Sequence, residues 1–241
     1  MTNVPVGRQN VCRSAADKLP PMQEREIVVG VSGASGALLA RRFVERVLTA
    51  PGLGRLHLVL TDSALKVARQ EIDREIDRPE RWVASLDAAK NVTSRIELHP
   101  DGDVGASIAS GSYPTAGMIV IPCSGGTLGA IAHGISRGLL QRAADVCLKE
   151  RRPLVLAFRE SPYSLVHVEN MRAATLAGAI IAPPTPAFYI AEPSMERFLD
   201  AYCARAARWL GLEVPGRADR WQGDAKPAGV PPRRRRRDRV E

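Results

Sequence analysis

The chain has 241 residues, of which 45% are hydrophobic, and this size and composition suit one α/β domain with tails. Aromatic residues make up only 5%, so the core must consist mainly of Ala, Val, Leu and Ile. The formal net charge is +8, no stretch reaches the ~18 apolar residues that cross a membrane, and the first residues lack the charged start and apolar core of a secretory signal.

Two tails flank the predicted domain. Residues 1–22 are polar and contain proline, and we expect this extension to be disordered. We place one domain over residues 23–212 and a C-terminal segment over residues 213–241, which contains Trp221 and the basic run Arg233–Arg237. Such a run is usually a solvated tail, and because no aromatic residues are interleaved with the arginines we do not expect nucleic acid as a partner. The positive balance also fits an enzyme whose substrates carry phosphate.

The four cysteines are Cys12, Cys123, Cys147 and Cys203. Their spacing is typical neither of a zinc site nor of a small disulfide framework, and we predict no metal site. We therefore expect reduced thiols in a cytoplasmic protein.

Apolar runs and helical spacing alternate along the chain. Buried strands are predicted over residues 26–31, 57–61, 118–122, 154–158 and 179–182, and helices over 37–49, 63–76, most of 127–149, and 195–210. Strands alternating with helices predict an α/β fold with a central parallel sheet and helices on both faces. Ligands of such folds bind beyond the carboxyl ends of the strands.

A glycine-rich loop, Gly30–Gly36, follows the first predicted strand and opens a helix. Glycines let a ligand approach the backbone closely, and a helix N-terminus offers free N–H groups to an anion. The spacing is neither that of the dinucleotide fingerprint nor that of a Walker loop. The loop therefore indicates a phosphate or flavin site, or a turn that needs glycine only for packing.

A second loop, Pro122–Thr127, repeats this arrangement after the third predicted strand. Two such loops at the ends of parallel strands can converge on one ligand. Cys123 could be a nucleophile, but no His or other base lies nearby in the sequence. A small buried thiol is the commoner role.

Charged and aromatic residues mark three further segments. Arg142 and Lys149 are seven residues apart and share a helix face, which is either a binding face or a solvated one. Arg159 and Glu160 end the fourth predicted strand, where an arginine can pair with phosphate and a carboxylate can move protons, unless they form a structural ion pair. The proline-rich run 183–189 presents Tyr189, and we expect the preceding residue, Phe188, in the core.

Taken in order, these segments resemble the UbiX-type flavin prenyltransferases. The resemblance runs from about residue 26 to residue 223. It is carried by Gly30–Gly36, His57–Thr61, Ala109–Ser112, Pro122–Thr127, Gln141–Leu156, Arg159–Pro162, Pro183–Tyr189 and Arg220–Gly223. No single motif is decisive, but the ordered set is specific.

The resemblance implies a flavodoxin-like or Rossmann-like fold that binds FMN. Members of the family take reduced FMN and dimethylallyl phosphate and join the dimethylallyl group to flavin N5 and then C6. Phosphate leaves and no metal is required. The product, prenylated FMN, is the cofactor of UbiD-type decarboxylases, and the usual assembly is a homo-oligomer, a dodecamer.

The family's functional residues map onto this chain as follows. FMN would be held by Gly33, Ala34, Ser35, Thr61, Ser124, Gly125, Gly126, Thr127 and Arg159. Dimethylallyl phosphate would be held by Tyr189 and Arg205, joined by Arg142 and Lys149, with Trp221 closing over it. Catalysis would use Glu160 as acid or base, Ser35 near flavin N5, and Glu71, which would reach the site from a neighbouring chain.

This chain departs from the family at one point, and two other functions remain open. The family usually has a bulky apolar residue and then Lys where this chain has Gly125 and Gly126, so a positive charge near the flavin ring is lost. An FMN-dependent cysteine decarboxylase would share the fold, but its Pro-Ala-Ser-Ala-Asn-Thr loop is absent, and no His follows the first helix at its catalytic position. The third reading is a nucleic-acid-binding or scaffold protein that uses the basic tail.

Overall fold

A single six-stranded sheet runs through the molecule. The computed structural model describes residues 24–88, 90–190 and 194–215. Every adjacent strand pair is parallel, and the spatial order is β3-β2-β1-β4-β5-β6. The strands are β1 (Arg25–Val31), β2 (Leu53–Leu60), β3 (Ile96–Pro100), β4 (Met118–Cys123), β5 (Leu154–Phe158) and β6 (Ile180–Ile181). This doubly wound α/β arrangement confirms the predicted fold class, and its order reverses between β1 and β4, which is where such folds bind ligands.

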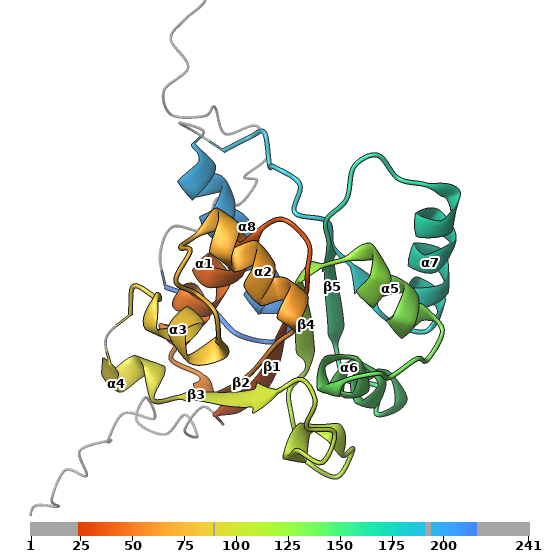
Figure 1. Cartoon of the computed structure of the whole chain (residues 1–241), viewed down its shortest axis with the longest axis horizontal. Coiled ribbons are helices and arrows are strands. Elements are labelled where there is room, and N and C mark those ends of the chain that lie inside the picture. Colours follow the sequence, from red (N-terminus) through yellow and green to blue (C-terminus); the bar gives the residue numbers. More distant parts are fainter. Residues whose placement is uncertain (1–23, 89, 191–193, 216–241) are drawn as a thin grey trace, which may run out of the picture.

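Helices cover both faces of the sheet (Figure 1). They are α1 (Ala37–Leu48), α2 (Asp62–Glu71), α3 (Pro79–Ala84), α4 (Lys90–Thr93), α5 (Gly125–Ala132), α6 (Leu139–Lys149), α7 (Leu165–Leu176), α8 (Met195–Trp209) and the short 3-10 helix η1 (Ser107–Ala109). In β1, Ile27 and Val29 join the core beneath α1 and α8, whereas Val28 joins the core beneath α5 and α6. Both faces of β1 are therefore apolar, which explains its continuous hydrophobic run.

The structure differs from the predicted elements in several places: the predicted helix 63–76 already ends at Glu71, and α3, α4 and η1 were not predicted. The prediction omitted β3, an edge strand that is only partly buried and therefore lacks a full apolar run. The predicted helical stretch 127–149 is two helices, because Gly134 adopts a φ of 66° between α5 and α6. The prediction also omitted α7, which begins with a capping box in which Ser164 and His167 bind each other's backbone.

Some expectations about side chains and tails change as well. Phe188 was expected in the core, but it is 91% exposed, because the proline-rich run leaves the sheet after β6. Trp221, the extension 1–22 and the run Arg233–Arg237 lie outside the described residues. Within the described ranges, none of the helices has both the length and the apolar character to cross a membrane.

Candidate active site

The first loop is shaped by close packing against α2. A Cβ atom on Gly33 would lie 2.4 Å from the Cβ of Ser63, so only glycine fits there. Gly36 has a φ of 125°, which favours glycine, and it caps α1. Between them, Ala34 is buried and Ser35 is exposed. The loop therefore presents the Ser35 side chain beyond the carboxyl end of β1.

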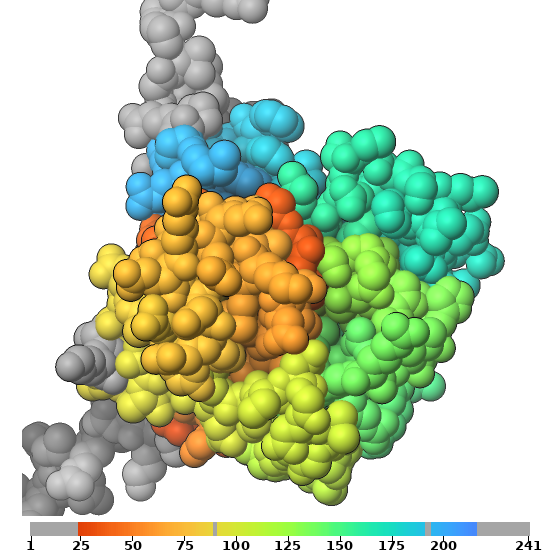
Figure 2. Space-filling view, viewed as in Figure 1, coloured from red at the N-terminus to blue at the C-terminus, as the bar shows by residue number. Residues whose placement is uncertain are grey.

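Ser32 ties the two loops together. Its Oγ donates to the carbonyl oxygen of Pro122 at 2.9 Å and accepts from the backbone N–H of Ser124 at 2.8 Å. The residue is only 1% exposed, so both bonds are shielded from water. In the surface view, the red and orange segment that contains α1 lies directly beside the green segment that contains α5 (Figure 2). The expected convergence of the two loops is therefore built into the chain, through a serine that the sequence reasoning did not single out.

Hydroxyl groups complete the second loop and a third one, the turn at Thr61 between β2 and α2. Ser124 Oγ accepts from the backbone N–H of Thr127 at 3.3 Å and so caps α5. Thr61 Oγ1 accepts from the backbone N–H of Ala64 at 3.1 Å and caps α2. These caps place Thr61, Ser124 and the following glycines at one edge of the sheet.

Cys123 lies directly beside these groups but is fully buried. Burial raises the pKa of its thiol, so the reactive thiolate is disfavoured. The structure thus supports a buried structural thiol and not a nucleophile.

The paired glycines leave the second loop open. No atom lies within 4 Å of the position that a Cβ on Gly126 would take. A Cβ on Gly125 would lie 3.1 Å from His167 Nε2, so the histidine of α7 crowds the place of the family's bulky residue. Because His167 Nδ1 accepts from the Ser164 backbone N–H at 3.2 Å, a neutral His167 carries its proton on Nε2, facing the loop. Exposed backbone, hydroxyl groups and this N–H fit the approach of a flat polar ring such as a flavin.

Glu71, the last residue of α2, is bonded to the end of the first loop of its own chain. Its Oε2 accepts from the backbone N–H groups of Gly36 at 2.9 Å and Ala37 at 2.7 Å. Burial alone would raise the pKa of this carboxyl, but hydrogen bonds from Ser35 and the two N–H groups, together with the charge of Arg159, outweigh burial and lower it. The resemblance implied that Glu71 acts from a neighbouring chain. In this chain α2 ends beside the N-terminus of α1, and a role of Glu71 in a neighbour's site stays a prediction.

Arg159 and Glu160 follow β5 at the same edge. The Arg159 backbone N–H donates to the Cys123 carbonyl at 3.1 Å, and its side chain is near enough to Glu71 to act on it electrostatically. Glu160 is exposed, and its Oε1 accepts from the Ser161 backbone N–H at 2.9 Å. A cation and a carboxylate therefore stand beside the three loops.

Tyr189 and Arg205 line one pocket of about 260 Å³ between the proline-rich run and α8. The Arg205 guanidinium lies 5.4 Å from the centroid of the Trp209 ring, which holds the charge over an aromatic face. The Tyr202 hydroxyl donates to the Ala182 carbonyl at 2.5 Å and fixes α8 against the end of β6. The structure thus brings together the two residues expected to hold the allyl donor.

Arg142 and Lys149 lie on α6, where both are bonded to other residues of the same chain. Arg142 donates from Nε to the Ala109 carbonyl at 3.1 Å and from a terminal nitrogen to Asp145 at 2.6 Å, and Lys149 pairs with Glu150. Helix α6 ends just before β5 begins, so Lys149 is at the amino edge of the sheet. The five residues of β5 span about 17 Å, which separates Lys149 from Arg159. One chain therefore does not bring these two basic residues together.

Comparison with known proteins adds a consistent set of relatives. The family model described as Flavoprotein matches residues 16–197. Flavin prenyltransferase UbiX of Salmonella typhimurium is 40% identical over 200 residues, which cover 83% of this chain and 99% of the relative. The crystal structure of AnUbiX (PadA1) in complex with FMN and dimethylallyl pyrophosphate has a TM-score of 0.71 and 38% identity, covering 83% of this chain and 99% of that one. A dodecameric FMN-dependent UbiX-like decarboxylase from Escherichia coli O157:H7 gives the same TM-score and identity, covering 82% and 99%.

Proposed function

Because this chain belongs to the flavoprotein family, among the UbiX flavin prenyltransferases, we propose which of its residues carry out the transfer of a dimethylallyl group to FMN. The protein is a flavin prenyltransferase with FMN as its flavin. The observation that carries the assignment of residues is the meeting of two Ser32-linked loops with Arg159 and Glu160 at one edge of the sheet. We also propose that the enzyme works in the cytoplasm, where the free buried thiols of Cys123, Cys147 and Cys203 stay reduced.

The three loops and Arg159 bind FMN. Their small residues and backbone groups give a flat ligand close access, and the set comprises Gly33, Ala34, Ser35, Thr61, Ser124, Gly125, Gly126, Thr127 and Arg159. When bound in its reduced form, FMN supplies the nucleophilic ring atoms N5 and C6. His167 adds a donor next to Gly125, the position at which other family members have a bulky apolar residue.

The allyl donor is dimethylallyl phosphate, and Tyr189 and Arg205 bind its phosphate group. An allylic phosphate ionises when positive groups stabilise the departing anion. Arg159 and Arg205 provide this charge without a metal in the reaction. Glu160 takes up or returns a proton on the phosphate. Ser35, bonded to Glu71, orients the reacting edge of the ring.

A direct assay tests this function. The full chain is incubated with FMN, a reductant and dimethylallyl phosphate, and the extracted flavin is weighed by mass spectrometry. We expect a flavin that is heavier than reduced FMN by one dimethylallyl group less one hydrogen atom. One inorganic phosphate should be released for each flavin that is modified. Unchanged FMN with the donor intact would exclude prenyl transfer. The product would then serve a decarboxylase of the UbiD type, which we propose as its recipient.

Arg142 and Lys149 join the same chemistry only if a second copy of the chain supplies them. Lys149 lies at the amino edge of the sheet, opposite Arg159, and Arg142 is bonded to Ala109 of the loop 107–113. A homo-oligomer, which we propose is the dodecamer of the E. coli O157:H7 relative, would bring this face to the site of a neighbour. Light scattering on the full chain should therefore show a large assembly.

Mixed oligomers test whether sites are shared between chains. Arg142→Ala and Glu160→Gln chains, each inactive alone, are coexpressed in equal amounts. We expect recovery of about a quarter of wild-type turnover, because random mixing pairs an intact Arg142 with an intact Glu160 in that share of sites. The matched control mixes Arg159→Ala with Glu160→Gln, two residues at the end of one strand, and should recover nothing. Equal absence of recovery in both mixtures would mean that Arg142 has no role in a neighbour's site.

A further inference from the structure

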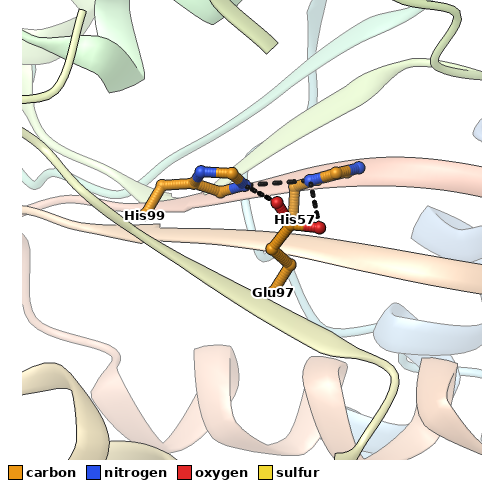
Figure 3. A group of neighbouring side chains, drawn as sticks. All are labelled: His57, Glu97 and His99. Carbon is orange, nitrogen blue, oxygen red and sulfur yellow. Dashed lines mark hydrogen bonds and ion pairs between the residues drawn. The ribbon is translucent and has the colours of Figure 1, made fainter. Parts of the chain in front are cut away.

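A cluster of two histidines and a glutamate lies on the two strands at the far edge of the sheet from Tyr189 and Arg205. In the register of β2 and β3, His57 faces Glu97 and Val59 faces His99. Side chains alternate along strands, so His57, Glu97 and His99 share one face. Their potential ligand atoms all lie within 4.8 Å of one another, and Figure 3 shows the three side chains converging.

The distances are close to those of a metal site. His57 Nδ1 lies 2.9 Å from His99 Nε2 and 3.9 Å from Glu97 Oε2, and His99 Nε2 lies 3.6 Å from Glu97 Oε1. Ligand atoms at the usual bond length of about 2.0–2.1 Å in a tetrahedral zinc site are about 3.3 Å apart. Shifts of a few tenths of an ångström would place all three around one ion. His57 is fully buried and His99 is 7% exposed, so competing water is largely excluded.

A second layer of contacts orients His57 for ligation. Its Nε2 lies 3.1 Å from Glu26 Oε2, which also accepts the Tyr113 hydroxyl at 2.5 Å. A proton on His57 Nε2 can be donated to this carboxylate oxygen, which fixes the orientation of the ring. The Nδ1 lone pair then points into the cluster, the carboxylate–histidine arrangement found behind many zinc ligands.

The other two groups are equally suited to bind a cation. His99 is only 7% exposed, and its Nε2 faces both His57 Nδ1 at 2.9 Å and Glu97 Oε1 at 3.6 Å. Arg55 holds Glu97 Oε2 at 2.6 Å and leaves Oε1 toward His99. Without an ion, the His99 Nε2–H can donate to His57 Nδ1, and binding moves that proton to the other ring nitrogen of His99. Water or the second Glu97 oxygen would complete the coordination.

We propose that His57, Glu97 and His99 form a structural site for a divalent first-row metal ion, Zn²⁺ by its donor set, that fastens β2 to β3. The site would also stiffen the loop 101–117, because Tyr113 of this loop is held through Glu26 and His57. The same loop accepts hydrogen bonds from Arg142 at Ala109 and from Arg152 at Gly111. The ion would join the two strands and would take no part in prenyl transfer.

Zinc titration of the chelator-treated full chain tests the site. We expect one Zn²⁺ per chain by calorimetry, a higher melting temperature with Zn²⁺, and visible absorption bands of tetrahedral Co²⁺ when cobalt replaces zinc. His99→Gln and Glu97→Gln should each weaken Zn²⁺ binding at least about tenfold, in the range seen for lost metal contacts. His133→Gln is the matched control, because it removes an imidazole bonded to Asn170 outside the cluster and should leave binding unchanged.

Three results would overturn the proposal. Native chain that binds neither Zn²⁺ nor Co²⁺ would show that the cluster is only a hydrogen-bonded imidazole pair. Equal binding by the His99→Gln and His133→Gln chains would show an adventitious ion at another place. Octahedral Co²⁺ bands would contradict the assigned ligands. The cobalt spectrum is measured on the native chain, so the test stands even if a variant fails to fold.

Discussion

Glu160→Gln should leave FMN binding intact and slow prenyl transfer by about 10²–10⁴-fold, the usual contribution of a general acid or base. Glutamine keeps the size of the side chain and the oxygen that accepts from the Ser161 N–H, but it can no longer carry the proton. Single-turnover mass spectrometry of the flavin measures the rate, and flavin fluorescence measures FMN affinity.

The control for this substitution is Glu169→Gln, which removes an exposed carboxylate on α7, away from the loops. It should transfer the prenyl group at the wild-type rate. If Glu160→Gln also works within a factor of about two of wild type, Glu160 is not the acid or base. If it loses FMN as well, the carboxylate supports binding and not proton transfer.

Arg205→Ala should weaken binding of the allyl donor while leaving FMN affinity nearly unchanged. Loss of a charge-assisted hydrogen bond to phosphate costs about 1.5–3 kcal/mol, which is roughly ten- to a hundredfold in affinity. Arg205 lines the pocket with Tyr189 and is held over Trp209, whereas the flavin loops lie at the ends of β1 and β4. Donor binding is measured by calorimetry and FMN binding by fluorescence.

Two variants sharpen the result. Arg205→Lys keeps the charge but not the planar fork and should fall between wild type and Ala. Arg172→Ala removes an exposed guanidinium from α7 and should change neither affinity. If Arg205→Ala loses FMN and donor equally, or neither, the assignment of Arg205 to the donor phosphate is wrong.

The sheet could be predicted wherever a strand is buried on both faces. The runs that became β1, β4 and β5 are apolar on both sides, and the structure places strands there. The edge strand β3 is only partly buried, and two of its residues belong to the polar cluster, so it lacks a continuous apolar run and alternates apolar and polar residues over only four positions. Helix α7 exposes Leu165 and Leu176 to solvent, so an apolar stripe of the usual kind is missing.

The site could be predicted in its loops but not in its cross-links. Loops after parallel strands converge by topology alone, which explains why the meeting of the loops Gly30–Gly36 and Pro122–Thr127 could be anticipated. The bonds of Ser32 to the second loop and of Glu71 to α1 join residues 34 or more positions apart, and no local pattern encodes them. The nearness of His167 to Gly125 depends on how α7 packs on α5, which spacing does not reveal.

The Glu71 carboxylate has a consequence for how the flavin is oriented. In many α/β proteins the N-terminus of such a helix binds a phosphate. In this chain the N–H groups of Gly36 and Ala37 already donate to the Glu71 carboxylate. A phosphate dianion brought there would meet like charge, so we expect the phosphate of FMN to bind elsewhere. The uncharged ring can approach the same place without penalty. The Glu71 carboxylate thus favours one orientation of FMN, with the uncharged ring near the N-terminus of α1 and the charged phosphate away from it.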